Sequence, residues 1–309
     1  MTARRPLRAI LAGYGQFGCL AFDAARAAGI DIVLVLTHRD RTGEFCWWDS
    51  VQERSVSAGI PVLIDDDFRP DSTLSTTLGQ LAPDLIISSF YRDILPAHIL
   101  ALPTHGAWNV HPSLLPTYRG RAPINWHLVH GESHCGLTVH RMVPRVDAGA
   151  IIAQVSVEID PDQDAYGLSW QLLRAGAPFL RQAFSDLAHG TAVERDMPLP
   201  LPPAYRGRRP ADGRIDWQQS ARSIHNLVRA VAPPWPGATA FLGGEWWTVV
   251  RTRVVDELAC AAPPGTILDR NRIACGSGII QCLLAVSGSQ HPQALPIGSR
   301  FTHSQEHSQ

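Results

Sequence analysis

Three polar residues of complementary type lie near the middle of the chain. Asn109 and His111 stand two positions apart at the end of a short apolar segment, and Asp147 follows within Val-Asp-Ala-Gly. Residues two apart on a strand point to the same face of its sheet, so the amide and the imidazole would be neighbours. The elements that follow this segment can bring the carboxylate of Asp147 next to these two side chains. This set suits acyl transfer to an amine, which needs a donor for an oxyanion and groups that move protons.

A strand-end hydrogen-bond network is the structural alternative for these residues. The three groups flank two motif loops, however, and residues 112–123 are broken by Pro and Gly. We therefore predict catalytic roles. Asn109 donates a hydrogen bond to the oxyanion, and His111 stabilises that charge and moves a proton toward the leaving nitrogen. Asp147 holds the His111 ring and favours its protonated form. The residue that accepts the proton of the amine is left open.

The elements around these residues alternate between apolar strands and helices. Strands are expected at 7–12, 31–37, 61–64, 85–88, 106–110, 136–141 and 150–158, and helices at 17–28, 51–58, 72–81, 124–130 and 167–187. Alternation of this kind predicts an α/β fold with a Rossmann-like parallel sheet and helices on both faces. Ligands bind at the carboxyl edge of such a sheet, where Asn109 and His111 end a strand.

A proline-rich segment divides the chain. We predict a catalytic domain over 1–196, an extended and semi-rigid linker over 197–209, a second domain over 210–301 and a polar tail over 302–309. The second domain starts with a helix at 220–231. Short strands separated by Gly and Pro follow at 239–242, 246–255, 265–268, 272–274 and 279–285. This pattern predicts a small β-barrel.

Composition narrows the class of protein. The 309 residues are 45% hydrophobic and 18% charged, which is typical of a soluble globular protein. No apolar segment approaches the roughly 20 residues that span a bilayer, and the N-terminus shows no secretory apolar segment with a cleavage site. Six scattered cysteines without a C-x-x-C pair favour inert thiols in a reducing compartment. We therefore expect a cytoplasmic protein.

All 27 basic residues are arginine. The absence of lysine excludes Schiff-base catalysis, attachment of pyridoxal phosphate and a P-loop lysine. A formal net charge of −1 argues against bulk nucleic-acid binding, which needs a basic surface. We therefore do not expect nucleic acid as a partner, although a local arginine patch stays open.

Two further patterns suggest ligand sites. Gly-x-Gly-x-x-Gly at 13–18 lies between a strand and a helix, but Thr37, His38 and Arg39 stand where a dinucleotide site wants an acidic residue, so we favour a structural turn. Four histidines also cluster in the sequence: His127, His130, His134 and His140. No carboxylate–histidine signature accompanies them, so we predict surface or core histidines and no metal.

The central segment carries a family resemblance. It reads Asn-Val-His-Pro-Ser-Leu-Leu-Pro from position 109 and Tyr-Arg-Gly-Arg-Ala-Pro-Ile-Asn-Trp from position 118. This resembles the folate-dependent formyltransferases, whose shared pattern is Asn-x-His-x-Ser-Leu-Leu-Pro, then Arg-Gly, then Asp-x-Gly. Within that family the chain is most similar to the sugar-nucleotide branch, typified by the enzyme acting on UDP-4-amino-4-deoxy-L-arabinose. Further matches lie at 137–143, 212–217, 224–231 and 234–238.

The resemblance implies transfer of a formyl group from 10-formyltetrahydrofolate to the amine of a small acceptor, above all a nucleotide-activated amino sugar. It also implies that the second domain is OB-like. Loops with apolar walls and exposed backbone groups suit a pterin, and the donor contacts are predicted at Phe90, Tyr91, Arg92, Ile94, Leu95, Ser113, Leu114 and Leu115. Acceptor contacts are predicted at Arg119, Gly120, Arg121 and Trp47.

Several alternatives stay open. The acceptor could be methionyl-tRNA or the amine of an amino acid such as hydroxyornithine, and with water as acceptor the protein would be a formyltetrahydrofolate hydrolase. A non-catalytic dinucleotide-binding module would use residues 13–18. No decarboxylase half follows the formyltransferase pattern, so formyl transfer alone is expected. Residues 288–300 depart from the family pattern, and the oligomeric state, a homodimer included, is undecided.

Overall fold

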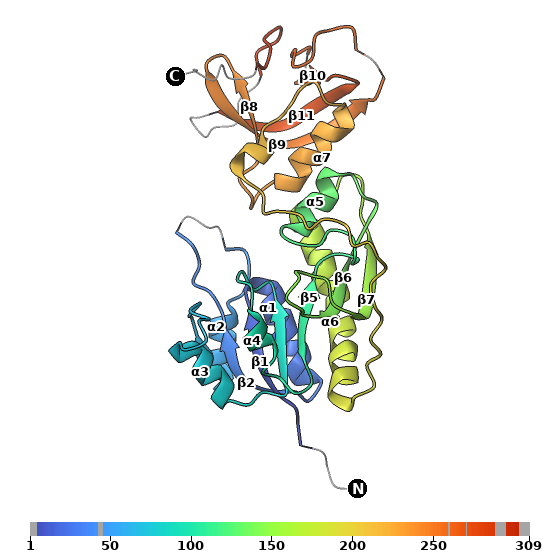
Figure 1. The fold of residues 1–309 in the computed structure, drawn as a ribbon. Coiled ribbons are helices and arrows are strands. Elements are labelled where there is room, and N and C mark those ends of the chain that lie inside the picture. The colour runs from blue at the N-terminus through green and yellow to red at the C-terminus, as the bar shows by residue number, and fades with distance from the viewer. Residues whose placement is uncertain (1–4, 43–45, 259, 270, 288–294, 303–309) are drawn as a thin grey trace. The chain divides into compact units, whose positions relative to one another are not determined.

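The computed structural model describes residues 5–42, 46–258, 260–269, 271–287 and 295–302 (Figure 1). They form two compact units. The first unit comprises Met1–Pro123, Cys135–Val157 and Trp170–Tyr205, and the second comprises Ile124–His134, Glu158–Ser169 and Arg206–Gln309. Residues 124–134 and 158–169 lie within the predicted catalytic domain in sequence, but their contacts group them with the C-terminal unit. The predicted domain boundaries, which follow sequence order, stay a prediction.

A seven-stranded sheet with strand order β3-β2-β1-β4-β5-β6-β7 forms the first unit. Its strands are β1 (Arg8–Gly13), β2 (Asp31–Leu36), β3 (Val62–Leu63), β4 (Leu85–Ser89), β5 (Ala107–His111), β6 (His134–Arg141) and β7 (Ile151–Glu158). Strands β1 to β5 pair in parallel, whereas β6 pairs antiparallel to β5. The predicted Rossmann-like sheet is confirmed, and the chain extends it with an antiparallel strand.

Helices cover both faces of this sheet, as predicted. The first unit contains α1 (Gly15–Ala27), α2 (Val51–Ser57), α3 (Thr73–Gln80), α4 (Ala97–Leu100) and most of α6 (Ala165–His189), while α5 (Pro123–Val129) belongs almost entirely to the second unit. Alternate residues of β1 enter different core clusters because successive strand side chains point to opposite faces. Ala9 and Leu11 belong to the cluster that contains Phe184 of α6, while Ile10 belongs to the cluster that contains Leu78 of α3. Helix α4 is too short for a periodic pattern and was not predicted.

The C-terminal unit contains α7 (Ala221–Val231) and a four-stranded sheet with strand order β10-β11-β9-β8. Its strands are β8 (Ala238–Leu242), β9 (Glu245–Asp256), β10 (Arg272–Ala274) and β11 (Ile279–Val286), and a 3-10 turn, η1, covers Pro210–Gly213. The antiparallel pairing confirms the small β domain as a half-barrel with β8 and β10 at its edges. The strand expected at 265–268 is wrong, because Thr266 and Ile267 make only isolated bridges.

Polar contacts of α7 explain why residues 124–134 and 158–169 group with this unit. His225 Nε2 lies 3.2 Å from the carbonyl oxygen of Pro161, and Arg229 donates to the carbonyl of Gln163 at 3.0 Å. Asn125 donates to the carbonyl of Ala230 at 2.6 Å. The predictions for 288–294 and 303–309 lie outside the described residues. Among the helices of the described ranges, none has the length and apolar character needed to cross a bilayer.

Asp84 connects the amino ends of the central strands in the first unit. Its side chain, in a residue only 4% exposed, accepts hydrogen bonds from both terminal nitrogens of Arg5, at 2.7 and 2.9 Å. It also accepts from the backbone N–H of Arg8 at 2.8 Å and from the Thr104 hydroxyl at 3.3 Å. The hydrogen bonds from Arg5 lower the pKa of Asp84 from 3.8 to about 2, although burial opposes the shift.

We predict that Asp84→Asn lowers the free energy of unfolding at pH 7 by about 1–2 kcal/mol, since it removes charge-assisted hydrogen bonds. Because the folded-state pKa is depressed, the carboxylate stabilises the protein above pH 3.8 and loses this effect as the pH falls toward 2. The difference between wild type and variant in urea unfolding should therefore shrink over that interval.

Asp67→Asn is the matched control. The pKa of Asp67 is also lowered to about 2, by Arg69, but this pair is exposed and screened by water. We expect it to change the unfolding free energy much less than Asp84→Asn does. Wild-type stability of Asp84→Asn at pH 7 would contradict the anchoring role of Asp84.

Candidate active site

Strand β5 carries Asn109 and His111 to the carboxyl edge of the parallel part of the sheet. Both side chains point to one side because they are two residues apart. The antiparallel neighbour β6 sets Asn109 opposite His140, and His111 opposite Thr138. The positions of Asn109 and His111 therefore depend on two strand pairings, that of β5 with β4 and that of β5 with β6.

The carboxylate of Asp147 is the point at which the predicted catalytic residues meet. Its Oδ1 accepts from the Asn109 amide at 3.4 Å, and its Oδ2 lies 3.6 Å from Nδ1 of His111. The backbone N–H of Gly120 donates to Oδ2 at 2.8 Å, and Nε2 of His140 lies 3.4 Å from Oδ1. Only 10% of the Asp147 side chain is exposed. The structure thus brings Asn109, His111 and Asp147 together and adds His140 to them.

His140 is a member of the site that the sequence pattern did not identify. Its Nδ1 lies 2.9 Å from the carbonyl of Arg141, so this nitrogen donates. Its Nε2 is then an acceptor and takes a hydrogen bond from Asn109 Nδ2 at 3.2 Å. No group of three or more potential metal ligands is found among the described residues. The one signal for His140 was the cross-strand register that places it opposite Asn109.

The protonation of His111 follows from its neighbours. The carbonyl of Tyr118 lies 2.9 Å from Nε2 and can only accept, so Nε2 carries a proton and Nδ1 faces Asp147. Burial lowers the pKa of His111 below its ordinary 6.5, and the charge of Asp147 opposes this shift. Near neutral pH the ring is therefore neutral, with its basic nitrogen directed at a carboxylate.

Asp147 itself stays ionised. Burial alone would raise its pKa, but the neighbouring rings of His111 and His140 outweigh burial and hold the pKa well below the ordinary 3.8. The backbone N–H of Gly120 acts in the same direction. A buried negative charge beside a neutral imidazole stabilises the imidazolium when a proton arrives at Nδ1.

Arg119, predicted to contact the acceptor, lies next to the site with its side chain turned to the backbone. The residue is 2% exposed. Its Nε donates to the carbonyls of Val146 and Asp147 at 3.1 and 2.9 Å, and its Nη1 donates to the carbonyl of Pro202 at 2.8 Å. Asp147 has a φ of 45°, a region that residues other than glycine rarely adopt. The contacts of Arg119 hold this backbone in place.

The segment after β4 contains most of the predicted donor contacts. Phe90 and Ile94 are 37% and 71% exposed, while Leu95 is buried in the core. The ring of Phe90 stacks on Phe17 with centroids 4.1 Å apart. Two contacts with His38 order the rest of the segment. His38 accepts a hydrogen bond from the backbone N–H of Arg92 at 2.9 Å, and its ring stacks on the ring of Tyr91. Phe90 and Ile94 are therefore the members with the most exposed apolar surface.

A buried threonine shapes the second predicted donor loop, residues 113–115. The hydroxyl of Thr138 donates to the carbonyl of Ser113 at 2.7 Å and accepts from the backbone N–H of Leu115 at 3.2 Å. Gln154 donates to the carbonyl of Leu115 and to the Thr138 hydroxyl, both at 2.9 Å. Ser113 and Leu115 are buried, and Leu114 between them is half-buried. Strands β6 and β7 thus fix the backbone of this loop.

The glycines at 13–18 serve close packing. A Cβ on Gly15 would stand 3.2 Å from the indole of Trp48, and one on Gly18 would stand 2.7 Å from Val51. The neighbouring Trp47 lies with its ring centroid 5.8 Å from that of Trp170. This agrees with the structural reading of the Gly-x-Gly-x-x-Gly pattern. Arg121, another predicted acceptor contact, is exposed and donates to the carbonyl of Arg92 at 2.7 Å.

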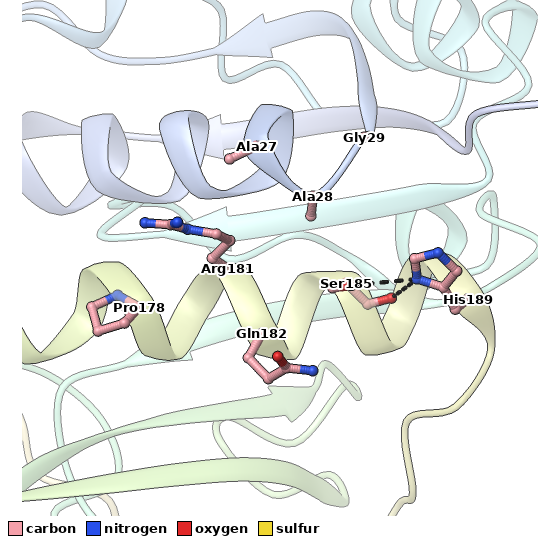
Figure 2. Close-up of a pocket in the computed structure, with 8 residues that line it drawn as sticks. All are labelled: Ala27, Ala28, Gly29, Pro178, Arg181, Gln182, Ser185 and His189. Carbon is pink, nitrogen blue, oxygen red and sulfur yellow. Dashed lines mark hydrogen bonds between the residues drawn. The ribbon is translucent and has the colours of Figure 1, made fainter.

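A cavity of about 600 Å³ lies apart from these residues (Figure 2). It is a shallow recess between the end of α1 and the last turns of α6, lined by Gly29, Arg181, Gln182 and His189 among others. None of the predicted catalytic, donor or acceptor residues lines it. We therefore assign the chemistry to the Asp147 cluster, where the titratable groups converge, and not to the recess.

Known protein families and solved structures resemble this chain along most of its length. The chain matches the formyl transferase family over residues 8–183 and the formyl transferase C-terminal domain over 208–292. WlaRD, a sugar 3N-formyl transferase solved in the presence of dTDP and 5-N-formyl-THF, is 15% identical. That alignment covers 94% of this chain and 99% of WlaRD, with a TM-score of 0.67.

Two further solved structures share the fold. The N-formyltransferase from Helicobacter canadensis, in complex with folinic acid and dTDP-3-aminofucose, is 14% identical over 89% of this chain and 98% of that one, with a TM-score of 0.69. Glycinamide ribonucleotide transformylase 1 from Symbiobacterium toebii is 24% identical over 63% of this chain and 95% of that one, with a TM-score of 0.53. With the family match covering more than half of its length, the chain belongs to the formyl transferase family.

Proposed function

We propose that the protein transfers a formyl group from 10-formyltetrahydrofolate to the amine of a nucleotide-activated amino sugar. The observation that carries this proposal is the convergence of Asn109, His111 and His140 on the buried carboxylate of Asp147. The likeness to two sugar N-formyltransferases, one solved with dTDP and one with dTDP-3-aminofucose, supports this choice of acceptor. The folate compounds present in those two structures support the choice of donor.

Asn109 supplies the first part of the chemistry. The donor provides a formyl carbon bound to nitrogen, and the neutral amine attacks that carbon with its lone pair while the carbonyl electrons move to oxygen. Among the residues of β5, Asn109 is the one that is not buried, so its amide is the most accessible. At rest Nδ2 lies 3.2 Å from His140 Nε2 and 3.4 Å from Asp147 Oδ1. Transfer of the longer hydrogen bond from Asp147 to the oxyanion stabilises the tetrahedral intermediate.

His111 and Asp147 complete the proton balance. One proton must leave the attacking nitrogen and one must reach the nitrogen of the donor as its bond to the formyl carbon breaks. Nδ1 of His111 is unprotonated at rest and faces Asp147 at 3.6 Å, so it can take the first proton and form an imidazolium beside a carboxylate. Delivery of that proton to the leaving nitrogen yields tetrahydrofolate and returns His111 to its neutral form.

The two loops predicted to hold the donor fit a flat, largely apolar ligand. Phe90 and Ile94 expose apolar surface after β4, and Leu114 lies between two buried neighbours. In this arrangement Leu95, Ser113 and Leu115 support the loops from the core. Tyr91 and Arg92 set the course of the chain through their contacts with His38.

The residues predicted to bind the acceptor divide into two groups. Arg121 and Trp47 have exposed or half-buried side chains and are proposed contacts of the acceptor. Arg119 and Gly120 hold the backbone and carboxylate of Asp147. The packing of Trp48 on Gly15 favours the transferase over a dinucleotide-binding module, which needs this turn to approach a pyrophosphate. The six cysteines are thiols and not disulfides, which fits the reducing, cytoplasmic location that the sequence predicts.

The direct test follows tetrahydrofolate release from 10-formyltetrahydrofolate with four acceptors: a UDP-amino sugar, a dTDP-amino sugar, methionyl-tRNA and hydroxyornithine. We expect release to require an amino sugar nucleotide. Asn109→Ala, His111→Ala and Asp147→Asn should each lower kcat at least ~100-fold, the usual effect of losing an oxyanion donor or a proton-transfer group.

His134→Ala is the control, because this exposed histidine lies outside the Asp147 cluster and should leave kcat unchanged. Release that requires methionyl-tRNA or hydroxyornithine would reassign the acceptor. Release without any acceptor would identify a hydrolase. Full activity of Asp147→Asn would refute the proposed site.

A second prediction concerns His140. His140→Leu removes the acceptor of the Asn109 hydrogen bond and should lower kcat about 10–100-fold with little change in KM, because a small displacement of a catalytic group has this effect. His140→Gln places an amide oxygen near the position of Nε2 and should restore much of the rate. Steady-state kinetics of both variants test this, and wild-type kcat in His140→Leu would exclude a positioning role.

A further inference from the structure

Part of the proline-rich linker lies against the loop that supports the catalytic residues. We call residues 202–205 the linker strap. Tyr205 forms a parallel bridge with Gly120, in which its N–H donates to the carbonyl of Arg119 at 2.6 Å and its carbonyl accepts from the N–H of Arg121 at 2.9 Å. The ring of Tyr205 stacks on the ring of Tyr118, with centroids 5.1 Å apart and an interplanar angle of 14°.

The same loop makes two contacts with the catalytic groups. The carbonyl of Tyr118 accepts from Nε2 of His111 at 2.9 Å, and the N–H of Gly120 donates to the carboxylate of Asp147 at 2.8 Å. These contacts alternate along the loop with those that bind the strap. Any displacement of the strap from the loop therefore acts on both catalytic groups at once.

Arg119 adds a side-chain link between the strap and Asp147. Its Nη1 donates to the carbonyl of Pro202 at 2.8 Å, while its Nε donates to the carbonyl of Asp147 at 2.9 Å. The guanidinium is buried, so both hydrogen bonds are shielded from water. One side chain thus joins the strap to the backbone that presents the catalytic carboxylate.

Gly120 is required by the closeness of the strap. A Cβ at this position would stand 2.2 Å from the carbonyl oxygen of Tyr205 and 2.8 Å from its nitrogen. The residue also has a φ of 96°, which side chains disfavour. A larger residue would push the strap away and disturb the hydrogen bond from Gly120 to Asp147.

We propose that the linker strap is part of the catalytic apparatus, with Tyr205 and Arg119 as positioning residues for His111 and Asp147. A linker that served only to connect two domains would need no contact with this loop. The inference rests on the proposed roles of His111 and Asp147 and extends them to Arg119 and to the linker residue Tyr205.

Gly120→Ala tests the inference, with Gly59→Ala as the matched control. Gly59 also has a positive φ, 71°, but a Cβ there meets nothing within 4 Å. We expect Gly120→Ala to lower kcat at least ~10-fold with KM for donor and acceptor within about twofold of wild type, since the catalytic groups shift while the binding surfaces remain. Gly59→Ala should keep the wild-type kcat, and thermal unfolding of both variants checks folding.

Introducing Gly120→Ala into Asp147→Asn separates positioning from a general structural defect. If the strap acts through Asp147, the further loss in this background should be less than about twofold, because the two changes remove one coupled function. The full ~10-fold loss in the Asp147→Asn background would overturn the proposal, as would wild-type kcat in Gly120→Ala. Full activity of Asp147→Asn alone would instead refute the proposed function.

If Gly120→Ala does not fold, Tyr205→Leu and Tyr205→Phe test the role of the linker strap. Phe keeps the ring that stacks on Tyr118, whereas Leu removes the stack, so kcat of the Phe variant should exceed that of the Leu variant severalfold at unchanged KM. Equal kcat in the two variants, or a loss confined to KM, would overturn the proposal.

Discussion

An ionised carboxylate can stay buried only when donors or positive charge surround both of its oxygens, and the site is organised around this requirement at Asp147. Strand β5 supplies the Asn109 amide, and β6 supplies His140, whose Nε2 accepts from the same amide. The Gly120 backbone and the His111 ring approach the other oxygen. Because these groups come from separate parts of the chain, they surround the carboxylate only when the strands and the loop have reached their native places.

The antiparallel extension of the sheet makes this arrangement possible. In the parallel part, successive strands end at one edge, and Asn109 and His111 reach that edge at the end of β5. Strand β6 runs the opposite way, so His140 comes to lie opposite Asn109, and the loop that follows β6 brings Asp147 to Asn109 and His111.

The alternation of apolar strands and helices, with Gly and Pro between them, predicted most elements of the fold. The two-residue spacing of Asn109 and His111 placed both side chains on one face of the sheet. His140 was missed because its role depends on cross-strand register, which spacing within one strand does not contain. The position of Arg119 in an Arg-Gly motif pointed to a ligand contact, but its burial depends on distant carbonyls such as that of Pro202. The segment expected as a strand at 265–268 makes only isolated bridges, to Ile273 and Arg300, and the apolar pattern of its residues does not show that the pairing is too short for a strand.

The contacts of the linker strap give the linker a role besides connecting the two domains. Proline in the linker limits the conformations of the unfolded chain, so an extended segment loses less entropy when it is fixed against a loop. The bridge at Gly120 and the hydrogen bond to Pro202 fix this stiff segment against the loop. Two non-glycine residues of that loop, Tyr118 and Ala122, have positive φ. Such a backbone persists only where its surroundings over-determine it. The strap supplies part of that constraint, which is why a connection between domains can bear on the chemistry at Asp147.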